Sequence, residues 1–187
     1  MITDAPPRRT AAQFLESDRI ASLEVPQNGT LPAIARMIEP AIKNAQRGDL
    51  RIASADFLLA CSEFYRVPPC GLSILAARPI RVRERWETEI FGDYNPATML
   101  IRVWMKTART KEVTSFGTFL STLCHELCHH LDFKCFKFPD SWHTRGFYAR
   151  TAALYHHARG TPPKRLFWVA LPRGRFRIDW PRTNRSV

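Results

Sequence analysis

Apolar residues recur every three or four positions in the first third of the chain, which is the spacing of one helix face. Three segments carry this pattern and predict helices over residues 10–22, 31–46 and 50–65. Proline removes a backbone donor, so Pro40 should interrupt the second helix. Residues 1–9 precede these segments without any such period, contain two prolines, and are expected to form a flexible N-terminus.

The pattern then changes to a period of two. Residues 80–83 alternate apolar and charged side chains, residues 89–96 combine a short apolar run with a turn sequence, and residues 98–105 alternate again. Such alternation is typical of half-exposed strands. These segments predict a small antiparallel sheet.

A long apolar segment follows. Residues 113–133 contain only two charged side chains, Glu126 and Asp132, and their apolar positions lie on nearly every side of a helix. A helix of this kind is buried. A loop should follow, and Asp140 or Ser141 can cap a further helix that runs to about Arg159. Two short strand-like pieces end the chain.

The elements together predict an α+β fold, in which a small sheet packs on the buried helix and on the helix that follows it. A helical part, residues 10–70, precedes a core of residues 71–187 whose end is basic. A chain of 187 residues is long enough for one compact domain and short for two.

Composition narrows the class of protein. Hydrophobic residues make up 45% and charged residues 24%, which excludes a largely disordered chain. No apolar run approaches the roughly 20 residues that span a bilayer, and the N-terminus lacks the order of a secretory signal. The five cysteines form no CxxC pair, so neither a disulfide framework nor a zinc ribbon is expected. A cytoplasmic location fits these features.

The net charge of +11 is concentrated at the C-terminal end. The last 43 residues carry ten basic side chains against Asp179 alone: Arg145, Arg150, Arg159, Lys164, Arg165, Arg173, Arg175, Arg177, Arg182 and Arg185. A basic region of this size can contact nucleic acid, an acidic protein or anionic lipid. An ordinary solvated surface explains the same charge equally well.

The most specific motif lies on the buried helix, where residues 125–129 read His-Glu-Leu-Cys-His. Residues four apart on a helix lie about 40° apart around the axis and about 6 Å apart along it. His125 and His129 can therefore bind one metal ion, with Glu126 beside them as a general base. A hydrogen-bonded pair of core histidines is the alternative.

A catalytic zinc takes three protein ligands, and three downstream residues are candidates for the third. His143 is favoured, because a helix–loop–helix turn can return it to the same face. Cys135, six residues after His129, is the alternative. Asp132 is better placed to accept a hydrogen bond from an imidazole, unless it pairs with Lys134 or an arginine. Of the other histidines, His130 is expected to form a structural hydrogen bond. His156 and His157 lie too far along the helix from His143 to share its ion and are expected to be solvated or packing residues.

Four stretches of this sequence resemble the SprT-like zinc metallopeptidases, over roughly residues 75–155. They are Phe91-Gly92-Asp93-Tyr94, the strand 99–105, the segment 120–132 around His-Glu-Leu-Cys-His, and His143-Thr144-Arg145-Gly146-Phe147-Tyr148. The resemblance implies a zincin-like fold, one Zn²⁺ on His125, His129 and His143, and Glu126 as the base.

The expected activity is hydrolysis of peptide bonds in a protein or peptide substrate by a zinc-activated water. The strand over residues 98–106 should line the cleft and accept an extended peptide as a further strand. Arg145, Tyr148 and Tyr94 are candidates for stabilising the oxyanion, and the sequence does not choose among them. Two alternatives stay open, both without catalysis. One is a nucleic-acid-associated module with structural zinc, and the other is a domain that binds a partner in the cleft.

Overall fold

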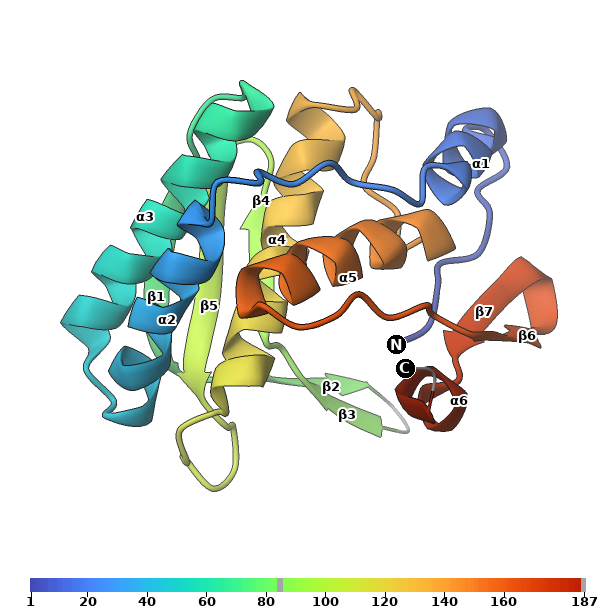
Figure 1. The fold of residues 1–187 in the computed structure, drawn as a ribbon. Helices are drawn as coiled ribbons and strands as arrows, with labels where there is room; N and C mark the ends of the chain where they lie inside the picture. Colours follow the sequence, from blue (N-terminus) through green and yellow to red (C-terminus); the bar gives the residue numbers. More distant parts are fainter. Residues whose placement is uncertain (84–85, 186–187) are drawn as a thin grey trace.

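A computed structural model describes residues 1–83 and 86–185 of the chain. Figure 1 shows its elements, which follow one another in this order: α1 (Ala11–Arg19), α2 (Thr30–Lys43), α3 (Arg47–Tyr65), β1 (Gly71–Ala77), β2 (Ile80–Arg83), β3 (Trp86–Glu89), β4 (Gly92–Asn95), β5 (Leu100–Lys106), α4 (Phe116–Lys134), α5 (Arg145–Arg159), β6 (Trp168–Leu171), the 3₁₀ turn Pro172–Gly174, β7 (Arg175–Ile178) and α6 (Trp180–Arg185). The expected α+β class is confirmed.

The main sheet has three strands in the order β1-β5-β4 and is mixed, not antiparallel as expected. β4 runs antiparallel to β5, with Tyr94 opposite Ile101, whereas β1 runs parallel to β5, with Ile74 opposite Val103. The sequence pattern missed β1, because this strand is rich in small residues and Ile74 is its one fully buried side chain. Two-stranded antiparallel hairpins, β2-β3 and β6-β7, lie outside this sheet.

Strand β5 lies at the centre of the main sheet, so both of its edges are paired. The strand expected to accept an extended peptide therefore cannot do so. β4 occupies the edge of the sheet, and among residues 1–83 and 86–185 it pairs with β5 alone. A peptide added to this sheet beside the cleft would have to pair with β4.

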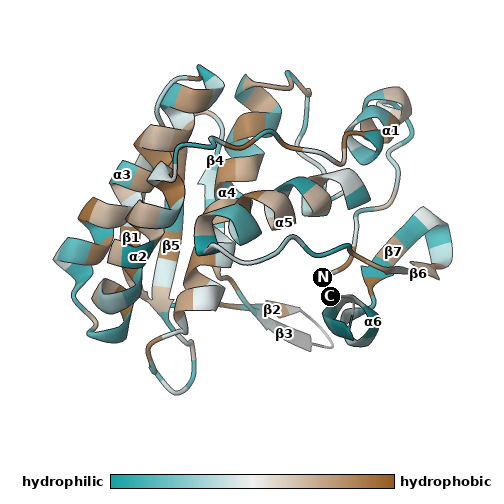
Figure 2. Cartoon of the chain, in the orientation of Figure 1, coloured by the Kyte–Doolittle hydropathy of each residue, from teal (hydrophilic) through white to brown (hydrophobic). Residues whose placement is uncertain are grey.

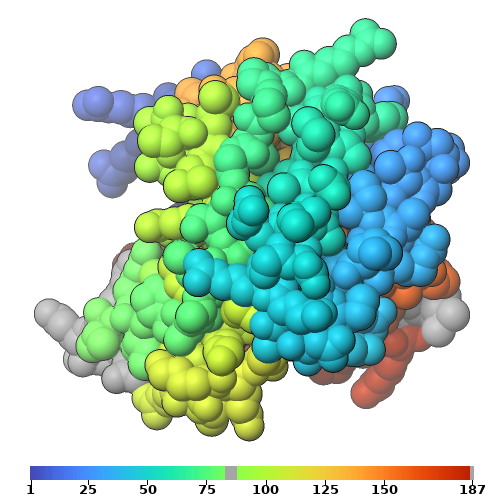
Figure 3. Space-filling model, turned by 90° about the vertical axis from the view of Figure 1, so that its left-hand side faces the viewer, coloured from blue at the N-terminus to red at the C-terminus, as the bar shows by residue number. Residues whose placement is uncertain are grey.

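The helices pack on the sheet and on one another around one hydrophobic core. α3 contacts β1, α4 contacts β4 and β5, and α2 bridges α3, α4 and α5. Hydrophobic positions gather on β5, α3 and α4 (Figure 2), and the core includes Ile38, Phe57, Ile101, Leu127 and Phe147. When the left-hand side of Figure 1 is turned to face the viewer, α2 and α3 cover a large part of the visible surface (Figure 3).

Helix α2 continues through Pro40, where an interruption was expected. Proline deprives the carbonyl four residues earlier, that of Arg36, of its helical partner. Both Pro40 and Arg36 are exposed, so water can reach the carbonyl, and the helix ends only three residues later at Lys43. The cost of the missing bond is small at this place.

The N-terminal segment, expected to be flexible over residues 1–9, makes ordered contacts at residues 2–4. The backbone of Ile2 bridges to Arg177 of β7, and Thr3 N–H donates to the carbonyl of Phe176 over 2.8 Å. Asp4 N–H donates to the carbonyl of His143 over 3.0 Å. The segment therefore joins β7 to the loop before α5.

Among the helices of residues 1–83 and 86–185, none combines the length and the apolar character that a bilayer crossing requires.

Candidate metal centre

Helix α4 supplies two of the three histidines. Ser115 caps the first turn of α4 by accepting a hydrogen bond from Thr118 N–H. The apolar residues of α4 bury the helix on nearly every side, as expected. His125 and His129 lie one turn apart on this rigid helix and are half-buried. Their separation is therefore fixed by helix geometry alone.

His143 comes from the loop before α5 and not from its first turn. The cap of α5 is Thr144, whose hydroxyl accepts a hydrogen bond from Phe147 N–H, where Asp140 or Ser141 was expected. Gly146, the second residue of α5, faces the end of α1: a Cβ there would lie 2.1 Å from the carbonyl oxygen of Ser17. The lack of a side chain at Gly146 therefore lets the end of α1 approach α5 closely.

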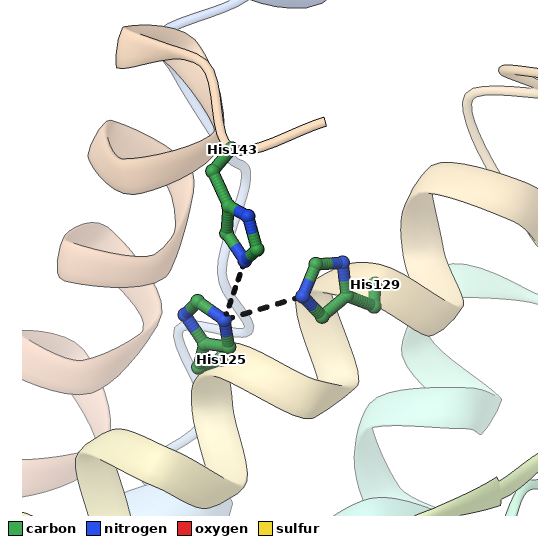
Figure 4. A group of neighbouring side chains, drawn as sticks. All are labelled: His125, His129 and His143. Carbon is green, nitrogen blue, oxygen red and sulfur yellow. Dashed lines mark hydrogen bonds between the residues drawn. The ribbon is translucent and has the colours of Figure 1, made fainter. Parts of the chain in front are cut away.

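The three imidazoles converge, as Figure 4 shows. Nε2 of His125 lies 3.1 Å from Nε2 of His143 and 3.2 Å from Nε2 of His129. Nε2 of His125 carries at most one proton and cannot form a full hydrogen bond to both of the other Nε2 atoms at once. Hydrogen bonding therefore does not satisfy the cluster. Tetrahedral zinc with bonds of about 2.0–2.1 Å would separate ligand nitrogens by about 3.3 Å. The group could hold a metal ion of this size.

The protonation of the rings also suits a cation. Burial, aided by the neighbouring His143, lowers the pKa of His125 to about 3. Burial and the adjacent His125 likewise lower the pKa of His129 far below its usual value. The two rings are therefore neutral at pH 7, and a neutral imidazole is the form that binds metal.

A chain of hydrogen bonds orients His129. Its Nδ1 lies 2.7 Å from Oγ of Ser141, and that hydroxyl donates its own proton to Oδ2 of Asp132 over 2.8 Å. Since the hydroxyl hydrogen is already used, Nδ1 of His129 must be the donor in the first bond. The lone pair of His129 is thereby placed on Nε2, toward the cluster.

Asp132 was expected to hold an imidazole directly, and it reaches His129 only through Ser141. The other expectation, pairing with an arginine, is met by Arg150, whose Nη2 lies 2.8 Å from Oδ1. Burial raises the pKa of Asp132, while Arg150 opposes that rise. Ser141 and Arg150 carry no signal in the sequence, because a lone serine and an arginine within a basic region are common.

Glu126 is buried beside the cluster and lines the same cavity. Burial, aided by Asp93, raises the pKa of Glu126 to about 8. A cation on the three histidines would favour the ionised carboxylate. Gly92 of β4 makes room for this carboxyl group, because a Cβ at Gly92 would lie 2.8 Å from its Oε1.

The cavity has a volume of about 1200 Å³. Its walls come from the α4 segment 117–129, the β4 region 89–96 and helix α5. The three histidines line it, and so do Arg159, Lys164 and residues of α6. The space is large enough for several residues of an extended peptide.

The three candidate oxyanion stabilisers fall into different places. Arg145 is paired with Asp18 on α1 and stacks on Phe176, and it does not line the cavity. Tyr94 and Tyr148 line the cavity, but their hydroxyls contact Nδ1 of His130 at 2.9 Å and the carbonyl of Ile2 at 3.1 Å. Each tyrosine would have to exchange that partner to reach a substrate.

The remaining sequence candidates lie outside the cluster. Cys135, at the exposed end of α4, is not among the grouped ligand atoms. His130 has a structural role, as expected: it contacts Tyr94 and lies 2.8 Å from the carbonyl of Pro68. His156 lies 2.8 Å from the hydroxyl of Thr161, at the far end of α5.

Much of the basic C-terminal region is folded against its own aromatic rings. The guanidinium of Arg182 lies 4.1 Å from the ring centre of Phe167, and that of Arg165 lies 5.3 Å from the same ring. Arg145 covers Phe176 at 4.2 Å. The rings of Phe167 and Phe176 are therefore already in contact with arginine side chains of the same chain.

No protein-family model, no curated protein and no solved structure matches this chain.

Proposed function

We propose that this protein is a zinc-dependent metalloendopeptidase with a zincin-like, SprT-like core. One observation carries the proposal: the carboxyl group of Glu126 and three converging imidazoles line one open cavity. A purely structural zinc site is closed by a fourth protein ligand, and it has no use for a carboxylate beside the first histidine. The HExxH spacing and the glycine that accommodates Glu126 support the same proposal.

In this proposal His125, His129 and His143 hold one Zn²⁺ through their Nε2 atoms. When bound there, the ion would make a nearby water molecule more acidic and would polarise the carbonyl group of a substrate. Ser141 and Asp132 keep the Nε2 lone pair of His129 directed at the cluster. The carboxylate of Glu126 takes the proton of the attacking water and passes it to the leaving amine.

The cleft suits an extended peptide. The outer edge of β4 offers backbone groups at the cavity, since Gly92, Asp93 and Tyr94 line it. A substrate strand paired there would run past Glu126, whose carboxyl group occupies the space that a side chain at position 92 would need. Tyr148 on α5 also lines the cavity, and its ring is stacked on that of His143 with 5.8 Å between the centroids. It is the better placed of the two tyrosines to face a carbonyl near the histidines.

The test is substitution of the proposed base. Glu126→Gln keeps the shape of the side chain, so the purified variant should retain one zinc per chain. Hydrolysis of casein should fall by about 10²–10⁴-fold, the usual contribution of a general base. Glu63→Gln, the same change at an exposed position of α3, is the control and should leave hydrolysis unchanged.

A non-catalytic domain that binds nucleic acid or a protein partner predicts different results. Wild-type protein with stoichiometric zinc would then hydrolyse no casein, and Glu126→Gln would bind the partner as the wild type does. Hydrolysis that is equal in Glu126→Gln and wild-type protein would contradict the proposed role of this residue.

A further inference from the structure

The third histidine differs from the other two in how its position is maintained. His125 and His129 are fixed by α4, whereas His143 lies in the loop between α4 and α5. A loop residue holds a defined orientation only where other groups fix its backbone and its side chain. The structure shows which groups do so.

Asp4 contacts His143 at three points, although 139 positions separate them in the sequence. Its backbone N–H donates to the carbonyl of His143 over 3.0 Å, and its Oδ2 accepts a hydrogen bond from His143 N–H over 2.9 Å. The same Oδ2 lies 3.4 Å from Nδ1 of the imidazole. The carboxylate thus faces the side of the ring that points away from the cluster.

The segment that carries Asp4 is itself attached to the body of the protein. Thr3 exchanges two hydrogen bonds with Phe176 of β7, each 2.8 Å long, through its backbone N–H and its hydroxyl oxygen. The carbonyl of Ile2 accepts a hydrogen bond from Tyr148 on α5. Asp4 is therefore a fixed group and not the end of a loose strand.

We infer that Asp4, which lies in the N-terminal segment, is a positioning residue that orients His143, the third proposed metal ligand. The inference rests on the proposed zinc site. A carboxylate repels lone pairs and attracts N–H groups, so it favours the tautomer of His143 with its proton on Nδ1. The lone pair is then on Nε2, the atom that lies 3.1 Å from Nε2 of His125. Asp4 does for His143 what Ser141 and Asp132 do for His129.

The test measures zinc affinity by competition with a chromophoric chelator in the full-length protein. Asp4→Ala removes both side-chain interactions, and zinc should bind about 10–100-fold more weakly, as for other groups that orient metal ligands. Asp4→Asn keeps an oxygen for His143 N–H but loses the charge, so its loss should be smaller. The dissociation constant reports on the site independently of peptide hydrolysis.

Asp18→Asn is the matched control. Asp18 accepts hydrogen bonds from the backbone N–H and the side chain of Arg145, two residues after His143, and contacts no imidazole. It should lower thermal stability without weakening zinc binding. Equal affinity of Asp4→Ala and wild-type protein, or equal weakening in Asp18→Asn and Asp4→Asn, would overturn the inference. Should Asp4→Ala fail to fold, the zinc affinities of Asp4→Asn and Asp18→Asn are compared instead, and the inference requires weaker binding in Asp4→Asn.

Failure of this inference is distinguishable from failure of the proposed function. Wild-type protein that binds zinc and hydrolyses no casein would contradict the peptidase activity alone, while the affinities would still test Asp4. Wild-type protein that binds no zinc would overturn both.

Discussion

Asp132 on α4 and Arg150 on α5 form an ion pair of 2.8 Å in which the side chains are 0% and 1% exposed. Arg150 also donates to the carbonyl of Ser17, at the end of α1, over 3.1 Å. The carboxylate of Asp132 in turn accepts the hydroxyl proton of Ser141, which contacts His129. One buried pair therefore joins three helices and leads to the candidate metal centre.

Removal of Arg150 should strongly destabilise the fold. Arg150→Met keeps much of the apolar volume but leaves the carboxylate of Asp132 buried without its partner, which costs about 3–5 kcal/mol. Urea denaturation of the metal-free protein measures the change in unfolding free energy. Arg102→Met, which breaks the exposed pair with Asp93, should cost below about 1 kcal/mol. Similar losses in the two variants would show that burial does not matter here.

The hydroxyl of Ser141 should matter for metal affinity more than for stability. Without it, Nδ1 of His129 loses its acceptor, and zinc should bind about 10–100-fold more weakly to Ser141→Ala. Ser121→Ala, another serine that lines the cavity, is the control and should bind zinc as the wild type does. Chelator competition measures both, and unchanged affinity in Ser141→Ala would refute the proposed role of the relay.

Gly92→Ala should impair hydrolysis without removing the metal. The new Cβ would lie 2.8 Å from Oε1 of Glu126 and 2.7 Å from a methyl group of Thr122, so the carboxyl group must shift. A displacement of about 1 Å can lower a rate by about 100-fold. Zinc content and kcat/KM for a peptide substrate measure the two effects. Gly48→Ala meets no atom within 4 Å and should leave both unchanged.

Substitution of the two candidate third ligands should give opposite results. His143→Ala removes one of the three converging nitrogens, so stoichiometric zinc should be lost after dialysis. Cys135→Ser changes an exposed atom outside the group and should retain one zinc per chain. Metal analysis of both variants provides the measurement. Zinc retained in His143→Ala but lost in Cys135→Ser would reverse the assignment.

The cysteines should differ in their reactivity toward iodoacetamide, because the thiolate is the reactive form. Burial raises the pKa of Cys128 to about 12 and that of Cys70 to about 11, so little thiolate exists at pH 8. Cys135 is exposed and should be labelled first. Labelling of Cys70 should rise about tenfold per pH unit toward its pKa. Mass spectrometry locates the label, and denatured protein provides the control.

The local features of the site were predictable from sequence because they depend on neighbouring residues. Five consecutive residues place His125, Glu126 and His129 on one helix, and the apolar positions around them bury that helix. The same reasoning gave the approximate extent of α3 and α5. It failed for the sheet, because the parallel pairing of β1 with β5 depends on how distant segments meet.

The sequence by itself determined a buried helix with two histidines and a glutamate in fixed relation, since a helix repeats the same geometry wherever it forms. Tertiary structure decided the rest of the site. It brought His143 rather than Cys135 to the cluster, placed β4 at an edge of the main sheet beside the cavity, and supplied Asp4 and Arg150 from segments without a motif. Contacts between distant segments depend on the packing of the whole chain, which no local pattern encodes.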